Sequence, residues 1–447
     1  MKTAFTSGMG FFTDAYDLNV ISTALLLITP QFHLTSGQVG LVGSTSLIAA
    51  FVGAFIFGRI ADVFGRKSVY GIEAAVMVIG ALLTAFAPNF VWLIVTRFIL
   101  GVGIGGDYPV SATIMTEYAP RRSRGRQVAM MFSSYSFGSI TALIIAMTLL
   151  SAGVNDNLAW RLMLGIGALP ALLVLYNRRR MPESPRFTEA VTSDSDRAAR
   201  ELNEFAGGAV TATASNQKPG RVTLRQFATS PRLLITLLGT AGAWFMYDIG
   251  AYGNSISQPR IVKMIAPQAS LAGVAAINLM IAVLAGLTGT LVCILVMDRI
   301  GRRLQQSIGL GVAGLALVLI GVAPAITASV LPFALVFGVA TFALDFGPNA
   351  GTMVFAAESF PVSVRTTGHG ISAGIGKVGA YIGALLSPVM LTDLGLEHTE
   401  LIMGLVYIVA IGFTLLIPEP RGRSLDELSS QMIPAPREEE APVAAQA

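Results

Sequence analysis

The chain has 447 residues, of which 53% are hydrophobic and only 13% are charged, with a formal net charge of +4. A soluble globular protein carries roughly 25% charged residues, so this composition excludes a soluble protein and indicates a chain that lies mainly in lipid. Cys293 is the single cysteine, which excludes a disulfide within one chain and a cysteine metal site. The histidines are too scattered to predict a metal site: His33, His369 and His398.

Apolar runs of roughly 18 to 25 residues recur along the whole chain, and each can cross about 30 Å of hydrocarbon as a helix. We predict an all-α integral membrane protein with twelve transmembrane helices. Their approximate centres are Asp17, Ala50, Val78, Gly105, Leu143, Leu169, Ala243, Val283, Ala313, Thr341, Ala380 and Val409. The first run holds two aspartates and has no small-residue cleavage site, so we expect a membrane helix there and no cleavable signal peptide.

Basic residues between the runs predict the orientation, because short loops rich in Lys and Arg stay cytoplasmic. They gather after the second, fourth and eighth runs: Arg59, Arg66, Lys67, Arg121, Arg122, Arg124, Arg126, Arg299, Arg302 and Arg303. The opposite loops have no Lys or Arg, except for Arg260 and Lys263 in "SISQPRIVKM". We therefore expect both termini to be cytoplasmic. Basic runs such as "RRSRGR" should anchor the chain at the membrane and bind no nucleic acid.

A polar stretch from "NRRRMPESPRF" to "TSPRL" divides the runs into two sets of six. The final "APREEEAPVAAQA" has the composition of a disordered tail. We predict an N-terminal six-helix half at residues 1–177, a cytoplasmic linker at 178–230, a C-terminal six-helix half at 231–417 and a cytoplasmic tail at 418–447.

The two halves repeat each other in sequence. "GRIADVFGRK" recurs as "VMDRIGRR", which separates Asp62 and Asp298 by 236 residues. "EYAPRRSR" recurs as "ESFPVSVR", which separates Glu117 and Glu358 by 241 residues. A duplicated six-helix unit with its binding site at midplane, between the halves, is a recurrent transporter plan.

Charged residues at these loop ends are candidates for gating salt bridges that hold one face closed. They are Asp62, Arg66, Glu117 and Arg124, with their repeats Asp298, Arg302, Glu358 and Arg365. A pair that forms in only one conformation biases the equilibrium between conformations. We therefore expect a mechanical role for them, without substrate contact.

No motif predicts a cofactor. Gly101, Gly103 and Gly106 in "GVGIGGDYP" match the dinucleotide-binding spacing, but no strand precedes them and they lie in an apolar run. Close helix packing explains them better, because small residues let membrane helices approach. We expect neither an enzyme, nor a cofactor, nor a metal ion.

"TDAYD" places Asp14 and Asp17 in the first apolar run, three residues apart and so on one helical face. A carboxylate in hydrocarbon costs at least about 2.5 kcal/mol and normally has a function. The repeat yields two pairs of carboxylates: Asp14 with Asp248, and Asp107 with Asp345. A buried carboxyl beside an anion holds a proton readily and can then donate a hydrogen bond, so we expect these four residues to couple protons to substrate. The alternative is a set of buried ion pairs with Arg97 and Lys377.

Longer motifs make the chain recognisable. "GRIADVFGRK" resembles the loop signature of the major facilitator superfamily, and "PESPR" with "PEPRGRSLDEL" resembles that of its sugar-porter-related branch. "GMGFFTDAYDL", "GGDYPVSATIMTEYA", "AWFMYDIGAYG", "FGPNAGTMVFAAESFP" and "TTGHGISAGIGKVGA" together resemble the phosphate:proton symporter family. The resemblance implies the major facilitator fold and proton-coupled import of inorganic phosphate by alternating access.

The resemblance also implies a substrate site. Family positions that hydrogen-bond phosphate, or lie near that pocket, are matched by Tyr108, Trp244, Asp248, Tyr252, Asn349 and Lys377. Trp244, Asp248 and Tyr252 recur every four residues and share one face. The sugar-porter resemblance implies an ion pair between Asp17 and Arg97.

Two residues depart from the family pattern. Tyr135 stands where the family has Gln, and still offers a hydrogen-bond donor. Asp345 stands where the family has Asn, and adds negative charge unless it is protonated or paired with Lys377. These departures leave open another phosphate-like or organic anion, or a neutral polyol.

We predict a proton-coupled phosphate importer that works as a monomer in the plasma or inner membrane. The alternatives are a sugar, polyol or organic-acid symporter and a non-transporting membrane sensor on the same scaffold. Within "TDAYD" we expect Asp17 to be the structural partner of Arg97, and Asp14 to share a proton-holding environment with Asp107.

Overall fold

The structure is a computed structural model that describes residues 2–64, 66–118, 124–178, 224–361 and 364–422. Within these ranges the chain is helical and contains no strand, so the predicted all-α fold is confirmed. Most of the predicted linker and most of the predicted tail lie outside the described residues.

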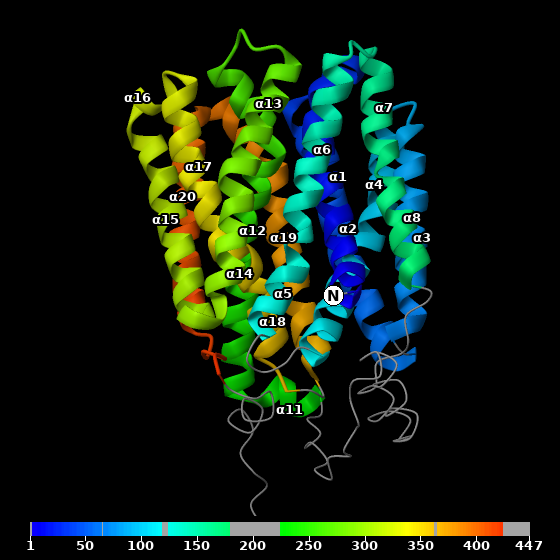
Figure 1. The fold of residues 1–447 in the computed structure, drawn as a ribbon, viewed down its shortest axis with the longest axis vertical. Helices are drawn as coiled ribbons and strands as arrows, with labels where there is room; N and C mark the ends of the chain where they lie inside the picture. Colours follow the sequence, from blue (N-terminus) through cyan, green and yellow to red (C-terminus); the bar gives the residue numbers. More distant parts are fainter. Residues whose placement is uncertain (1, 65, 119–123, 179–223, 362–363, 423–447) are drawn as a thin grey trace, which may run out of the picture.

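The N-terminal half consists of upright helices that stand side by side (Figure 1). They are α1 (Lys2–Phe32), α2 (Ser36–Phe64), α3 (Arg66–Ala85), α4 (Phe90–Tyr118), α5 (Arg124–Phe132), α6 (Ser134–Ser151), α7 (Asp156–Ile166) and α8 (Ala168–Arg178). The fifth membrane crossing is formed by α5 with α6, and the sixth by α7 with α8.

The C-terminal half repeats this plan. Its helices are α11 (Leu224–Thr229), α12 (Pro231–Ile265), α13 (Leu271–Ile281), the π-helix η3 (Ala282–Leu287), α14 (Thr288–Ile300), α15 (Arg302–Val322), α16 (Pro324–Thr327), α17 (Val330–Phe346), α18 (Pro348–Glu358), α19 (Arg365–Asp393) and α20 (Gly395–Leu415). One crossing consists of α13, η3 and α14, and another of α17 and α18.

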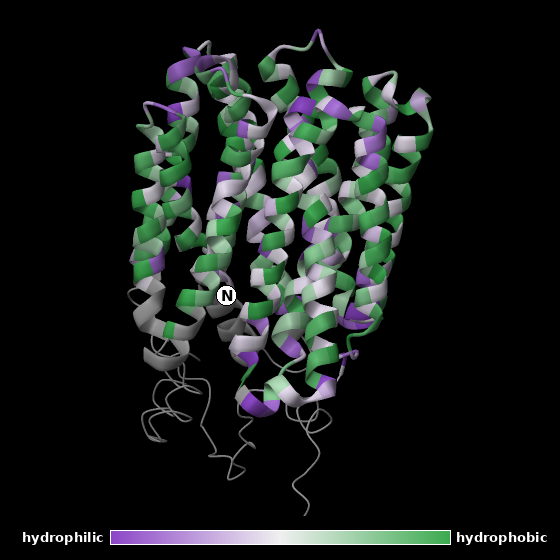
Figure 2. Cartoon of the chain, turned by 180° about the vertical axis from the view of Figure 1, so that it is seen from behind, coloured by the Kyte–Doolittle hydropathy of each residue, from purple (hydrophilic) through white to green (hydrophobic). Residues whose placement is uncertain are grey.

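The described helices include eleven that are long and apolar enough to cross a membrane. The remaining predicted crossing is α3, whose apolar part was found over Gly71–Ala85. All the predicted centres lie within helices, and Figure 2 shows hydrophobic residues along the helices and hydrophilic residues gathered toward their ends. The chain is a multi-pass membrane protein, and its helices fit the predicted twelve.

Several crossings are interrupted where they pass the centre of the bundle. Ser133 separates α5 from α6. Gly347 separates α17 from α18, which begins at Pro348, a residue with no N–H to continue the ladder of α17. The π-helix η3 interrupts the eighth crossing, and π-helical turns are frequent at functional sites. Irregular backbone at membrane depth is tolerated where it lines a cavity, and Gly286 of η3 does so.

Glycines let the helices approach closely. A Cβ at Gly105 of α4 would overlap the carbonyl oxygen of Ala50 in α2, and one at Gly383 of α19 would overlap that of Ile249 in α12. Such close packing holds helices together where lipid removes the hydrophobic driving force. The glycines with dinucleotide-like spacing lie inside α4 and pack against neighbouring helices in the same way.

The two halves contact each other at both ends of the bundle. At the upper end in Figure 1, the hydroxyls of Ser36 in α2 and Thr392 in α19 are 3.0 Å apart. At the lower end, the backbone N–H of Arg126 in α5 donates to Asp298 Oδ2 in α14, with N and O 2.9 Å apart. Because these contacts close the two ends of the bundle, we look for a substrate site at its centre.

Candidate substrate and proton site

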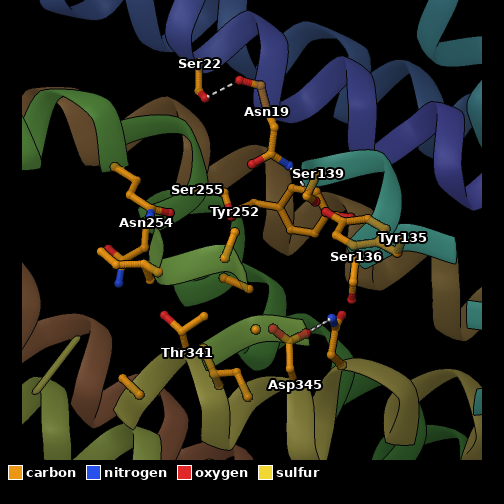
Figure 3. A pocket seen from close by; sticks show the side chains of 18 of the residues that line it. Asn19, Ser22, Tyr135, Ser136, Ser139, Tyr252, Asn254, Ser255, Thr341 and Asp345 are labelled. Atoms are coloured by element: carbon orange, nitrogen blue, oxygen red, sulfur yellow. Dashed lines mark hydrogen bonds between the residues drawn. The ribbon is translucent and has the colours of Figure 1, made fainter. Parts of the chain in front are cut away.

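A cavity of about 150 Å³ lies between the two halves. Its wall is formed by α1, α4, α5 and α6 on one side and by α12, α13, η3, α17, α18 and α20 on the other, with a single residue of α15. Figure 3 shows Asn19 of α1, Tyr135 of α6, Asn254 of α12 and Asp345 of α17 around this space. Polar side chains from both halves therefore meet at one place.

Most of the predicted substrate-binding residues lie in this wall: Tyr108, Tyr135, Trp244, Asp248, Tyr252 and Asn349. Lys377 of α19 is outside the lining and only 2% exposed. Its Nζ donates to the hydroxyls of Tyr252 and Tyr108, at 2.5 and 3.0 Å, and lies 4.5 and 4.2 Å from the centroids of the same two rings. A desolvated ammonium over aromatic faces is stabilised by their quadrupoles, so Lys377 is a held cation directly behind the wall.

Asp14 of α1 is the anionic member of this group. Its Oδ2 is 3.7 Å from Lys377 Nζ and accepts a hydrogen bond from the Tyr108 hydroxyl. At an effective dielectric constant of about 20, unit charges at this separation attract by about 4 kcal/mol. We call Asp14, Tyr108, Tyr252 and Lys377 the Lys377 cluster. Its members come from both halves, so it depends on their relative position.

Asp248 is the carboxylate of the cavity wall itself. It is 1% exposed, and its Oδ2 has no hydrogen-bond partner among the described residues. Trp244, one turn earlier on α12, also lines the cavity and places its ring 6.5 Å from that of Tyr108. An unpartnered carboxyl oxygen beside a cavity is a position where a substrate or a proton can bind.

Asp345 lies on another part of the wall. Its Oδ1 accepts from the Asn349 amide at 2.5 Å, and Asn349 Oδ1 accepts from the Tyr247 hydroxyl at 3.0 Å. The pairing with Lys377 that the sequence left open is not the one found, because Lys377 is engaged by the cluster defined above.

Asp17 and Arg97 form a two-pronged ion pair. Arg97 Nη1 and Nη2 donate to the two carboxylate oxygens of Asp17 at 3.1 and 3.0 Å. The guanidinium also donates to Ser46 Oγ at 2.8 Å and to the carbonyl oxygen of Val42 at 2.9 Å. Arg97 is 0% exposed, so this charge is compensated entirely within the protein.

Asp107 differs from the other predicted proton-coupling residues in its surroundings. It is 2% exposed, lies outside the cavity lining, and accepts from the Ser111 hydroxyl at 2.5 Å. Asp14 is instead engaged by Tyr108 and Lys377. The shared proton-holding environment of Asp14 and Asp107 therefore remains a prediction.

The predicted gating residues of the C-terminal half lie at the lower end of the bundle. Arg302 Nη2 is 2.7 Å from Asp298 Oδ1, and Arg302 Nε is 3.3 Å from Glu358 Oε2. Arg365 donates from Nε to the Phe360 carbonyl oxygen at 3.1 Å. The side chains of their counterparts lie outside the described residues: Asp62, Arg66, Glu117 and Arg124.

Sequence reasoning missed several polar residues of the wall. They are Asn19, Ser22, Ser136, Ser139, Tyr247, Asn254, Ser255, Gln258, Asn278, Thr341 and Tyr407. A single amide in an apolar helix could have indicated such a residue, as Asn278 does in "LAGVAAINLMI". Polar groups in hydrocarbon usually face the bundle interior, where a cavity can form.

Comparisons with known proteins agree with this architecture. Residues 3–431 match the family described as "Sugar (and other) transporter". The chain belongs to that family. It is 32% identical to the "Probable inorganic phosphate transporter 1-6" of Arabidopsis thaliana, with 96% of this chain and 93% of that protein covered. It is 33% identical to the "Low affinity inorganic phosphate transporter 3" of Petunia hybrida, with 95% and 91% covered.

More distant relatives point the same way. The "Repressible high-affinity phosphate permease" of Neurospora crassa is 29% identical, with 96% of this chain and 86% of that protein covered. Among solved structures, the major facilitator proton:xylose symporter XylE bound to 6-bromo-6-deoxy-D-glucose superposes with a TM-score of 0.80 at 20% identity, covering 97% and 98% of the two chains. This likeness shows the major facilitator fold, and the named relatives are transporters, not enzymes.

Proposed function

We propose that this protein is a proton-coupled secondary transporter that imports inorganic phosphate by alternating access. The observation that carries the proposal is the Lys377 cluster, held directly behind a cavity that Asp248 lines with an unpartnered oxygen. The cation attracts an anion, and the anion favours the neutral form of a neighbouring carboxyl. The names of the relatives support phosphate as that anion.

Phosphate offers oxygens that accept hydrogen bonds, and the wall offers donors. The Tyr135 and Tyr252 hydroxyls, the Trp244 indole N–H and the Asn349 amide all come from cavity-lining residues. Dihydrogen phosphate also brings its own hydroxyls, so Asp248 can accept from it. A bond from the Lys377 ammonium to the anion would contribute about 1.5–3 kcal/mol.

Asp14 gives this site a proton switch. In the described conformation the Asp14 carboxylate forms an ion pair with the Lys377 ammonium and compensates its charge. A proton on Asp14 removes this attraction and leaves Lys377 free to attract phosphate, so the two ligands favour each other. When phosphate leaves, Lys377 attracts Asp14 again and favours release of the proton. We assign Asp107 and Asp345 as further carboxyls that take part in this coupling.

Alternating access would use the contacts at the two ends of the bundle. Asp298 accepts from the Arg126 backbone and also pairs with Arg302, so this lower contact must open when the cavity faces that side. The Ser36–Thr392 contact must open for the other side. Ligands shift such an equilibrium only as far as they bind one state more tightly than the other.

We further propose a monomer in the plasma or inner membrane that binds no nucleic acid, with both termini cytoplasmic. The basic loops at the lower end support this orientation. Impermeant-reagent labelling of cysteines introduced at Ser36 and Ser195 should report opposite sides of the membrane, and labelling of both from one side would contradict the orientation.

A second candidate is a symporter of a neutral polyol or an organic acid. The presence of Asp345 and Tyr135 in the wall favours it, because an additional carboxylate can accept hydrogen bonds from the hydroxyls of a polyol. Uptake of labelled phosphate into proteoliposomes, against sugars and organic acids and with and without a proton gradient, decides between them. Proton-stimulated accumulation of phosphate alone supports the proposal, and accumulation of a polyol in its place refutes it.

A further inference from the structure

Glu400 of α20 is a buried carboxyl to which the transport cycle above gives no task. It is 0% exposed, and Asn254 of α12 donates from Nδ2 to its Oε2 at 3.1 Å. Asn254 is part of the cavity wall, whereas Glu400 is not. The Asn254 side chain therefore separates Glu400 from the cavity, as the tyrosines of the Lys377 cluster separate Lys377 from it.

Buried oxygens without a hydrogen-bond partner among the described residues gather here. They are Glu400 Oε1 and Asn254 Oδ1. Within the described part of the chain, the cavity wall also holds the unpartnered amide nitrogen and oxygen of Asn278 and the unpartnered hydroxyl of Tyr407, which can donate as well as accept. A carboxylate and an amide oxygen can only accept, and each buried acceptor left unpaired costs about 1–3 kcal/mol. A proton bound to Glu400 removes one of these unpaired acceptors and supplies a donor in its place.

No cation stands level with Glu400 in the described part of the helices packed against α20. These helices are α12, α15 and α19. Asp248 and Arg260 lie six residues on either side of Asn254, about 9 Å along the axis of α12. Arg260 is turned away to the Pro388 carbonyl and the Thr392 hydroxyl.

The other two helices add no closer charge. In α15 the charged residues are confined to its other end, at Arg302 and Arg303. Gly253 of α12 is level with Gly383 of α19, and Lys377 lies six residues before it. The cations Arg232 and Lys263 of α12 and Arg365 of α19 lie near helix ends, and Lys263 and Arg365 donate to the carbonyl oxygens of Ala269 and Phe360. The remaining titratable groups on these elements are Tyr247 and Tyr252 on α12, His369, Tyr381 and Asp393 on α19, and Glu397, His398 and Tyr407 on α20. An ionised Glu400 would be an unpaired charge in hydrocarbon, which is costly.

We propose that Glu400 is a proton-binding site, loaded from the cavity through Asn254, that carries a further proton in each transport cycle. Asn254 lies on α12, the helix that also carries Asp248 and Tyr252 of the cavity wall. A shift of α12 on substrate binding therefore changes the hydrogen bond that Glu400 receives. Proton binding at Glu400 is independent of what is transported, and only its contribution to the cycle rests on the function proposed above.

Infrared difference spectroscopy of the full chain in lipid nanodiscs tests the site directly. Glu397→Gln is the matched control, because Glu397 lies in the same helix and accepts from Thr327 near the helix end. As the pH is lowered, wild type and Glu397→Gln should gain a buried-carboxyl C=O band that Glu400→Gln lacks. The site is overturned if Glu400→Gln loses no pH-dependent band, or if the band responds to sodium ions at constant pH and not to protons.

The proton-to-phosphate ratio tests the contribution to transport. At the steady state of phosphate accumulation in proteoliposomes, Glu400→Gln should couple one proton fewer per phosphate than wild type and Glu397→Gln. An unchanged ratio overturns the contribution of Glu400 to the cycle. Failure of the wild type to move phosphate would refute the proposed function instead, and the infrared titration would still decide the proton site.

Discussion

Neutralising Asp17 should destabilise the protein by an amount that its surroundings predict. Arg97 is 0% exposed and depends on Asp17 for the compensating charge. In Asp17→Asn one acceptor oxygen remains, but the new amide N–H₂ faces guanidinium N–H groups that need acceptors. Removing one partner of a buried ion pair costs about 3–5 kcal/mol, so we expect a fall of that size in the free energy of unfolding.

Asp14→Asn is the matched control, three residues earlier on α1. It also removes the carboxylate partner of a buried cation, but Lys377 keeps the Tyr108 and Tyr252 hydroxyls as acceptors and the faces of both rings. We therefore expect Asp14→Asn to fold, with a loss below about 2 kcal/mol, and to flatten the pH dependence of uptake.

Denaturant titration in detergent, followed by tryptophan fluorescence, measures both effects. The double variant Asp17→Asn/Arg97→Gln should recover part of the lost stability, because no buried charge is left alone. The reasoning is refuted if Asp17→Asn is as stable as wild type and alters the pH dependence, while Asp14→Asn fails to fold.

Three further substitutions test the site and the lower contact. Asp248→Asn should abolish proton-driven uptake more completely than it weakens phosphate binding, and wild-type uptake under a pH gradient would exclude Asp248 from coupling. Lys377→Gln should weaken phosphate binding by about 10- to 100-fold, the loss of a charge-assisted bond, as measured by scintillation proximity; unchanged binding would remove Lys377 from the site. Asp298→Asn loses the ion pair to Arg302 and should raise the labelling rate of a cysteine at Ser136 by reagent added on the lower side, whereas an unchanged rate would show that this pair is no gate.

The sequence predicted the helices because lipid imposes a simple length and polarity rule on each of them. It also led to Asp17 as the partner of Arg97, through the sugar-porter resemblance, but not to Ser46 or the Val42 carbonyl. It could not predict that Lys377 is held by two tyrosines from α4 and α12, because those contacts cross between helices far apart in the chain. The position of Asp345 beside Asn349 was not predicted either. The sequence left a pairing of Asp345 with Lys377 open, whereas the carboxylate accepts from Asn349, across the break between α17 and α18.

Glu400 shows a second limit. The rule that an intramembrane carboxylate marks a function applies to it as well as to "TDAYD", but no repeat partner and no family motif directed attention to it. Its meaning depends on Asn254 of another helix and on the absence of a nearby cation among the described residues, which only a three-dimensional arrangement reveals.

The most direct test of the central claim is the internal pH of proteoliposomes when substrate is added with no proton gradient imposed. External phosphate should acidify the lumen of vesicles that contain the wild-type protein, and D-xylose should not. Asp248→Asn should abolish the phosphate response. Phosphate accumulation without acidification, or acidification driven by D-xylose, would contradict proton-coupled phosphate import.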